Sequence, residues 1–223
     1  MIQLEGVSKI YMNGSELTVL DNVTVHIKRN EYVGIFGPSG SGKSTMLHII
    51  GLLDRPSVGR VFFRGRDITT LSDEEASRTR GREIGFVFQS FHLVPNLSVL
   101  ENVELPLFYQ GVKAAERSER AKTSLDRVRM SHRLGHLPSQ LSGGERQRTA
   151  IARALVTDPD LILADEPTGN LDSKTGQEIL DFLDLLHSEG KTIIMITHDV
   201  AIARRLPRLL RINDGRVTEG DRP

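Results

Sequence analysis

One stretch of the sequence has the residue types and spacing of a phosphate-binding loop. It reads, in order, Gly37, Pro38, Ser39, Gly40, Ser41, Gly42, Lys43, Ser44 and Thr45. Glycines allow backbone conformations that a side chain would forbid, so successive N–H groups can point at phosphate oxygens. We expect the ammonium of Lys43 to meet the β- and γ-phosphates and the hydroxyl of Ser44 to bind Mg²⁺. The pattern therefore predicts a nucleoside triphosphate site built from these nine residues.

The residues on either side of this loop favour the same interpretation. Such a loop should follow a buried strand and lead into a helix. Residues 32–36 form a short apolar run typical of a strand covered on both faces, and residues 44–53 carry apolar side chains at helical spacing up to Leu53. We expect the helix to begin at Thr45, with its positive end facing the anion. The alternative is a glycine-rich turn with an incidental lysine.

A second group of candidate residues follows another apolar run. Residues 161–164 are all apolar and place Asp165 and Glu166 at the carboxyl end of a predicted buried strand, where wound α/β sheets bind ligands. We expect Asp165 to hold Mg²⁺ through its water shell and Glu166 to orient and polarise an attacking water. The alternative is that this acidic pair, with the proline after it, only caps a following helix.

The composition excludes several other classes of function. The chain has 223 residues, 38% of them apolar, which is enough for a proper core. Basic and acidic residues both number 29, so no net charge favours nucleic acid or an anionic membrane as a partner, and we expect no nucleic-acid binding. There is no cysteine for a disulfide, a thiolate metal site or a cysteine nucleophile. Since neither a signal peptide nor a run of ~18 apolar residues is present, we expect the chain not to enter a membrane by itself.

The order of the predicted elements indicates the fold class. Residues 2–11 and 23–28 alternate apolar and polar side chains, which predicts an antiparallel β layer at the start. Further on, buried-strand runs such as residues 84–88 and 193–196 alternate with helical patterns, as they do in a parallel sheet wound by right-handed crossovers. The sequence therefore predicts an α/β fold with a mostly parallel wound sheet.

A helical insert is predicted within this α/β pattern. Ser98 is placed to cap a helix that Pro106 should interrupt, and residues 114–130 form a mixed-charge helix with apolar residues too sparse for deep burial. Ser142 opens another helix with an apolar stripe. We expect one domain over residues 1–223, with a core of residues 1–89 and 160–223 and a helical subdomain at about residues 90–159.

A third motif, Leu-Ser-Gly-Gly-Glu-Arg-Gln at residues 141–147, lies between the phosphate-binding loop and Asp165. It belongs to an ordered set with Gln89 after one strand, Gly-Asn-Leu-Asp at residues 169–172, and His198 after the last parallel strand. This set runs over nearly the whole chain and resembles that of the ATP-binding subunit of an ABC transporter. The resemblance implies the fold of a P-loop NTPase, with ATP and Mg²⁺ as its ligands.

The resemblance also implies roles for single residues. Tyr11 resembles the aromatic residue that stacks on adenine, for which a flat ring is suited. Gln89 resembles the switch that reaches Mg²⁺ and the attacking water while it senses the partner subunit. His198 resembles the contact to the γ-phosphate, which can orient the water and stabilise developing charge. A lone histidine after a strand or an aromatic residue in an edge strand is otherwise usually structural.

The motif at residues 141–147 implies a composite site. Ser142 and the N–H groups of Gly143 and Gly144 form a second phosphate-binding helix start. In the family this motif faces the phosphate-binding loop of a second chain across a head-to-tail dimer. The resemblance therefore implies a homodimer on ATP binding, with Asp172 at the seam between the two chains.

The sequence departs from the common family pattern at two places, and the second departure indicates a branch of the family. Asn30 stands where the family often has glycine, and asparagine tolerates a positive φ. The motif at residues 169–172 replaces the commoner Ser-Ala-Leu-Asp and resembles the lipoprotein-releasing and macrolide-exporter branch. That branch implies a separate membrane permease docked near residues 90–108, export or extraction of lipoprotein, peptide or drug-like cargo, and a peripheral location on the cytoplasmic face of the inner membrane.

Two other functions fit parts of the sequence. One is a soluble ATPase of the same superfamily in DNA repair or translation, which would usually carry a long insertion or a second cassette. The other is a nucleotide-dependent scaffold of the cell-division type, against which the intact Lys43, Asp165, Glu166 and His198 argue.

Overall fold

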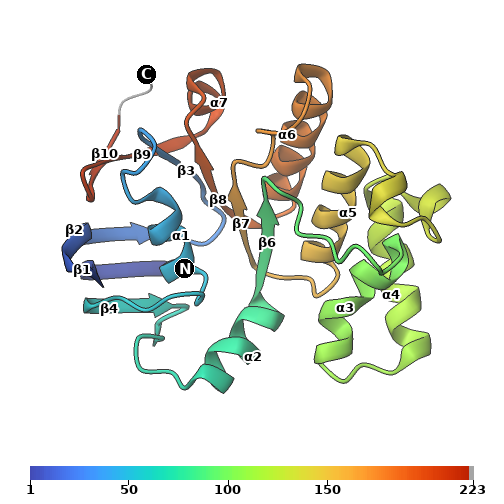
Figure 1. The fold of residues 1–223 in the computed structure, drawn as a ribbon, viewed down its shortest axis with the longest axis horizontal. Helices are drawn as coiled ribbons and strands as arrows, with labels where there is room; N and C mark the ends of the chain where they lie inside the picture. Colours follow the sequence, from blue (N-terminus) through green and yellow to red (C-terminus); the bar gives the residue numbers. More distant parts are fainter. Residues whose placement is uncertain (221–223) are drawn as a thin grey trace. The chain divides into compact units, whose positions relative to one another are not determined.

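The computed structural model describes residues 1–220, which Figure 1 draws as a ribbon. The chain divides into two compact units, one formed by residues 1–77 with the residues from 190 onward, and the other by residues 78–189. The predicted helical subdomain at residues 90–159 falls inside the second unit, and its boundaries stay a prediction.

The first unit contains the expected antiparallel layer. Its strand order is β2-β1-β4-β5. The bounds are Ile2–Asn13 for β1, Ser15–Ile27 for β2, Val58–Phe63 for β4 and Arg66–Asp67 for β5. In the second half of β2, Val23, Val25 and Ile27 are buried while the residues between them are exposed. The alternation in the sequence therefore corresponds to one covered face, and β2 begins earlier than predicted.

A second set of strands in this unit carries the phosphate-binding loop. Strand β3 (Tyr32–Phe36) runs parallel to β8 (Thr192–Thr197) and to β9 (Arg208–Asn213), while β10 (Arg216–Glu219) pairs with β9 as an antiparallel hairpin. Every residue of β8 is buried, as are four of the five residues of β3. Apolar runs without alternation therefore form strands covered on both faces.

Helix α1 (Lys43–Ile50) follows the loop, and α7 (Val200–Arg205) follows β8. The prediction that α1 begins at Thr45 and extends to Leu53 is wrong at both ends. Gly42 has a left-handed φ of 104°, so the helix begins at the next residue. At the other end Leu52 has a φ of 58°, which ends the helical path and leaves Leu53 46% exposed.

The second unit combines two parallel strands with helices. Strand β6 (Ile84–Phe88) pairs with β7 (Leu161–Asp165), and α2 (Asp73–Glu83) precedes β6 in the chain. The other helices are α3 (Val99–Tyr109), α4 (Ala114–Arg127), α5 (Gly143–Leu155) and α6 (Ser173–Ser188), with short 3₁₀ turns at Ser131–Arg133 and Pro138–Gln140. Helices α3, α4 and α5 pack side by side in this unit (Figure 1).

Two expectations for these helices are wrong. Pro106 does not interrupt α3, which continues to Tyr109. Proline removes one helical hydrogen bond, but its neighbours Val103 and Leu107 are fully buried, and their packing outweighs that loss. Helix α4 ends at Arg127 and does not reach Met130 as predicted, and of its apolar residues Ala121 and Leu125 are fully buried while Ala114 and Ala115 are exposed.

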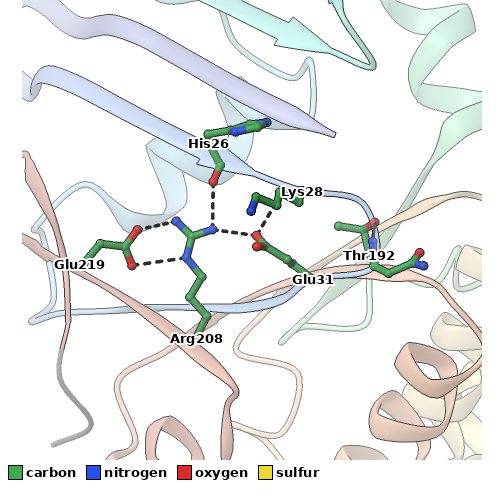
Figure 2. A network of polar contacts seen from close by, with 7 residues as sticks. His26, Lys28, Glu31, Thr192, Arg208 and Glu219 are labelled. Atoms are coloured by element: carbon green, nitrogen blue, oxygen red, sulfur yellow. Dashed lines mark hydrogen bonds and ion pairs between the residues drawn. The ribbon is translucent and has the colours of Figure 1, made fainter.

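A network of polar contacts holds the turn that leads into β3 (Figure 2). The guanidinium of Arg208 donates to the carboxylate of Glu31 at 2.7 Å and to the carbonyl of His26 at 2.9 Å, and it forms an ion pair with Glu219. Glu31 also accepts from the N–H of Lys28 at 2.9 Å. One arginine thus joins the end of β2, the start of β3 and the β9–β10 hairpin.

Asn30 lies in the same turn with a φ of 60°, and its N–H donates to the hydroxyl of Thr192 at 3.1 Å. The expectation that asparagine replaces glycine here at a positive φ is confirmed. The turn therefore connects the start of β3 to Thr192, the first residue of β8.

Replacing Arg208 by glutamine should destabilise the protein by about 1–2 kcal/mol near neutral pH, because it removes the bonds to Glu31 and Glu219. Burial favours a higher pKa for Glu31, but its hydrogen bonds with Lys28 and Arg208 outweigh burial and lower the pKa. A lowered pKa gives stability that is present above the unfolded-state value and is lost as pH falls through the folded-state value.

The difference between wild type and Arg208→Gln should therefore shrink from about pH 7 to about pH 3, as measured by urea denaturation. Arg216→Gln is the control, because Arg216 pairs with Asp21 through a side chain that is 77% exposed. An Arg208→Gln effect that stays constant over this pH range would contradict the assignment.

Candidate functional site

The phosphate-binding loop lies between β3 and α1 in the first unit. Gly40 and Gly42 have φ angles of 78° and 104°, the left-handed region that the sequence pattern predicts for a loop of inward-pointing N–H groups. A Cβ on Gly42 would lie 2.7 Å from the carbonyl oxygen of Val19 in β2. The N–H of Gly215, in the β9–β10 turn, donates to the carbonyl of Ser41 at 3.2 Å. Backbone on both sides therefore fixes the loop.

Lys43 is buried, with 7% of its surface exposed, and its ammonium donates to the carbonyls of Gly37 at 2.9 Å and Pro38 at 2.7 Å. The buried hydroxyl of Ser41 has no hydrogen-bond partner among residues 1–220. A buried polar atom without a partner costs free energy, and a phosphate oxygen is suited to satisfy both groups. The residues of the loop therefore fit a phosphate.

Tyr11 lies in β1 and is 37% exposed. Its hydroxyl donates to the carboxylate of Asp54 at 2.6 Å, and the ammonium of Lys9 lies 4.7 Å from the centre of its ring. Burial raises the pKa of the Tyr11 hydroxyl, as does the bond to Asp54, while a bond with Thr45 acts in the opposite direction. The hydroxyl of Tyr11 therefore lies beside Thr45 of helix α1.

His198 belongs to the first unit as well. It follows the last residue of β8 and is exposed, while the next residue, Asp199, caps α7 by accepting from the N–H of Ala201 at 2.7 Å. The structure therefore fixes the backbone beside His198 through the cap of a short helix. The hydroxyl of Thr197 adds to this by accepting from the N–H of Asp199 at 3.0 Å.

The acidic pair lies in the second unit, at the carboxyl end of β7. Asp165 is the last residue of the strand and pairs in register with Phe88 of β6, so Gln89 and Glu166 leave the two strands side by side. Glu166 has a φ of 46°, an uncommon value for a residue with a side chain. Asp165, Glu166 and Gln89 are all half-buried. Backbone strain of this kind occurs at functional sites.

The motif at residues 141–147 begins helix α5. Ser142 and Glu145 form a capping box, in which the Ser142 hydroxyl accepts from the N–H of Glu145 at 3.3 Å and the Glu145 carboxylate accepts from the N–H of Ser142 at 2.8 Å. The N–H groups of Gly143 and Gly144 lie in the first turn. A Cβ on Gly144 would lie 2.5 Å from the Cγ2 of Thr175, so Gly144 also permits close packing of α5 on α6.

Asp172 caps helix α6. Its carboxylate accepts from the N–H of Thr175 at 3.0 Å, and hydrogen bonds with Thr175 lower the pKa of Asp172. Asp172 and Ser142 thus cap two helices whose first turns pack against each other through Gly144 and Thr175.

The sequence did not predict two residues that shape the segment after Gln89. Asn102 is fully buried, and its side-chain amide bonds to the backbone of Val94, Leu97 and Ser98. Arg153 in α5 donates to the carbonyls of Phe91 and His92. The sequence did offer one signal for Asn102, because it is a polar residue that lies among the apolar residues Val99 and Val103 on the covered face of α3.

Arg153 supports an unusual piece of backbone. Phe91 and His92 have φ angles of 62° and 49°, two left-handed residues in succession. Burial lowers the pKa of the Arg153 guanidinium, whose donors are used on the two carbonyls. Arg146 lies over the ring of Phe91, 5.3 Å from its centre. Helix α5 therefore holds this turn at two points.

The structure thus gathers the predicted site residues in two groups. The first unit holds the loop at residues 37–45, Tyr11 and His198, and the second unit holds the remaining ones: Gln89, Ser142, Gly143, Gly144, Asp165, Glu166 and Asp172. In the described residues, no helix is long and apolar enough to cross a membrane.

Comparison with known proteins decides the family. The model of the family described as "ABC transporter" matches residues 20–169. The chain belongs to the ABC transporter family. It is an ATP-binding cassette, an ATPase of the transporter type, and the predicted resemblance and α/β fold class are confirmed.

Curated relatives of this ABC cassette cover most of the chain. An ABC transporter ATP-binding protein of Thermotoga maritima is 51% identical, over 97% of this chain and 93% of the relative. The ABC transporter ATP-binding protein YknY of Bacillus subtilis is 49% identical, over 97% of this chain and 95% of the relative. The macrolide export ATP-binding/permease protein MacB 2 of Aeromonas hydrophila is 47% identical over 98% of this chain, which spans 34% of that longer protein.

Solved structures of ABC cassettes have the same fold. The dimeric post-hydrolysis structure of the ATP-binding cassette MJ0796, bound to ADP and Pi, has a TM-score of 0.91 and 45% identity, and covers 100% of this chain and 98% of that one. A second dimeric structure, of MJ0796 as a bacterial ABC transporter cassette, has a TM-score of 0.92 and 46% identity, with the same coverage.

In this ABC cassette, Gly42→Ala should destabilise the loop more than Gly40→Ala. At Gly40 an added Cβ meets open space, so alanine bears only the strain of a left-handed φ, about 1–2 kcal/mol. At Gly42 it also meets the backbone of Val19, which should raise the loss to about 3–4 kcal/mol. Urea denaturation without nucleotide measures both variants, and equal losses would contradict the proposed packing.

Proposed function

We propose that this chain is the ATP-hydrolysing subunit that drives a separate membrane permease, in the lipoprotein-releasing and macrolide-exporter branch of the ABC family. The observation that carries the proposal is the loop itself, with Lys43 and the unpartnered hydroxyl of Ser41 buried around a turn of left-handed glycines. Charge and polar groups held in this way receive an anion with little rearrangement. The likeness to MacB 2, named for macrolide export, supports the branch.

Nucleotide binding falls to residues of the first unit. The N–H groups at residues 37–45 and the ammonium of Lys43 bind the phosphates of ATP. The ring of Tyr11 stacks on adenine, and the bond from its hydroxyl to Asp54 keeps the partly exposed ring in one orientation.

Ser44, Gln89 and Asp165 are the residues that hold Mg²⁺. These residues fit the cation because Mg²⁺ prefers oxygen ligands, and they offer a hydroxyl, an amide oxygen and a carboxylate. When bound, Mg²⁺ neutralises negative charge that develops on the phosphate oxygens.

Glu166 acts as the base that takes a proton from the attacking water, whose oxygen then bonds to the γ-phosphorus as ADP leaves. The strained backbone of Glu166 supports this role, since it holds the carboxylate at the end of β7. His198 donates a hydrogen bond to the γ-phosphate and stabilises the charge that develops there.

The site is completed by a second copy of the chain. Ser142 with the N–H groups of Gly143 and Gly144 forms a helix start that receives the γ-phosphate of ATP held by the partner. Asp172 lies at the seam, next to that helix start through the packing of α5 on α6. The dimeric structures of MJ0796 support pairing with a second copy.

The permease docks on the segment near residues 90–108, which places the subunit on the cytoplasmic face of the membrane. Within this segment the apolar side chains of Phe91, Leu93 and Leu97 are half-buried. Val94 is 36% and Phe108 58% exposed, and they are the apolar side chains that this segment offers to a partner.

Glu166→Gln should lower ATP turnover by about 100-fold or more while ATP binding persists, because only the proton acceptor is lost. With Mg²⁺ and ATP this variant should sediment as a dimer, and without nucleotide as a monomer. Lys43→Ala is the contrasting variant, since it removes the cation of the loop and should abolish both binding and dimer formation. Turnover like that of wild type in Glu166→Gln would refute its role as the base.

Val94→Asp combined with Phe108→Asp should abolish co-purification with the permease from detergent-solubilised membranes. Both side chains are exposed, so basal ATP hydrolysis should stay within about two-fold of wild type. Leu185→Asp is the matched control, because Leu185 is 49% exposed on α6, outside the predicted docking segment. If the double variant co-purifies with the permease as well as the control does, the prediction that the permease docks at residues 90–108 is wrong.

A further inference from the structure

Gln89 and the turn after β7 are in direct contact within the second unit. The turn closes through two backbone bonds, from the N–H of Gly169 to the carbonyl of Glu166 at 3.0 Å and from the N–H of Leu171 to the carbonyl of Thr168 at 3.1 Å. It then ends at Asp172, the cap of α6. Because β6 and β7 are parallel and in register, Gln89 leaves its strand beside the start of this turn.

Asn170 forms a reciprocal pair with Gln89. Its side-chain nitrogen Nδ2 donates to the carbonyl oxygen of Gln89 at 2.9 Å, and its oxygen Oδ1 accepts from the side-chain nitrogen Nε2 of Gln89 at 3.4 Å. The first bond is of normal length and the second is long, so the backbone is held more firmly than the side chain. Among residues 1–220 no hydrogen bond occupies the Oε1 of Gln89.

Gly169 leaves the space that the Gln89 side chain occupies. A Cβ at position 169 would lie 2.5 Å from Nε2 and 3.0 Å from Cδ of Gln89. Carbon and nitrogen do not approach so closely, so any other residue would displace the amide. The φ of Gly169 is not in the left-handed region, so its backbone conformation does not require glycine. The close contact with Gln89 is therefore the reason for a glycine at this position.

We propose that Gly169 and Asn170 are positioning residues for Gln89, which orient its amide so that Oε1 stays available as an oxygen ligand. The nitrogen of the amide is engaged by Asn170, and the absence of a side chain at position 169 lets it lie there. This inference rests on the proposed role of Gln89 toward Mg²⁺. It connects that role to the turn that carries Asp172, so that a movement of the turn changes which amide atom Gln89 presents.

The first test is Gly169→Ala, compared with Gly135→Ala. Both replace a glycine of the second unit, but a Cβ at Gly135 meets open space. Because the atoms displaced by Gly169→Ala are the end of a flexible side chain, the fold should persist. We expect the Mg²⁺ concentration for half-maximal ATP hydrolysis to rise about three- to ten-fold in Gly169→Ala and in Asn170→Ala, the effect of losing one hydrogen bond, and to stay unchanged in Gly135→Ala.

The second test repeats Gly169→Ala in a Gln89→Ala background. Without the Gln89 side chain there is nothing for the added methyl group to displace, so the effect of Gly169→Ala on the Mg²⁺ requirement should vanish. The side-chain amide resonances of Gln89, identified by their loss in Gln89→Ala, give a readout that does not depend on activity. In nucleotide-free protein they should shift in Gly169→Ala and in Asn170→Ala, but not in Gly135→Ala.

The outcomes separate this inference from the proposed function. If Gln89→Ala itself leaves the Mg²⁺ requirement at the wild-type value, the metal role of Gln89 fails, and the positioning of Oε1 fails with it. If Gln89→Ala raises the requirement but Gly169→Ala behaves like Gly135→Ala, only the positioning by Gly169 and Asn170 is overturned. Unshifted Gln89 amide resonances in both variants would overturn it as well.

Discussion

Three stretches of backbone meet where the phosphate-binding loop turns into α1, and no side chain fits between them. An added Cβ on either Gly42 or Gly215 would lie 2.7 Å from the carbonyl oxygen of Val19. The same stretches are joined by hydrogen bonds, from Asp21 to Gly215 at 2.9 Å and from Gly215 to Ser41 at 3.2 Å. Since protein interiors are close-packed, this contact leaves no room for a side chain at either glycine. The conformation of the loop therefore depends on β2 and on the β9–β10 hairpin as well as on its own glycines.

In the second unit, strained backbone that other elements support lies beside the candidate site residues. Glu166, Phe91 and His92 all have left-handed φ angles, just after the ends of β7 and β6. Strained backbone of this kind persists only where several contacts with the surrounding structure hold the same conformation. Arg153 supplies part of that support for Phe91 and His92 from helix α5, and the buried amide of Asn102 does so for the residues that follow.

In the second unit, the first turns of helices α5 and α6 pack against each other. The helices that Ser142 and Asp172 cap, α5 and α6, pack so closely that a Cβ on Gly144 would clash with Thr175. The turn before Asp172 in turn contacts Gln89. The motif at residues 141–147, the turn at residues 166–172 and Gln89 therefore form one continuous set of contacts. Because these three parts touch, a movement of one of them can be passed to the other two.

The sequence by itself determined the phosphate-binding loop, the acidic pair after an apolar strand and the order of strands and helices. These depend on spacing and periodicity along the chain, which are local properties. Roles could be proposed for Lys43 from the loop pattern and for Asp165 and Glu166 from their place at the carboxyl end of a buried strand, where α/β sheets bind ligands. The family resemblance added Gln89, Ser142 and His198, which no local pattern would have distinguished from structural residues.

Only the tertiary structure shows which contacts explain the residue type at particular positions. The sequence motifs include Gly144 and Gly169 but do not show which side chains lie against them, and these are Thr175 and Gln89. Pro106 was read as a helix breaker, yet burial of the residues around it keeps α3 continuous. Contacts of this kind join residues far apart in the chain. Their distances follow from how the elements pack, which the sequence pattern alone does not contain.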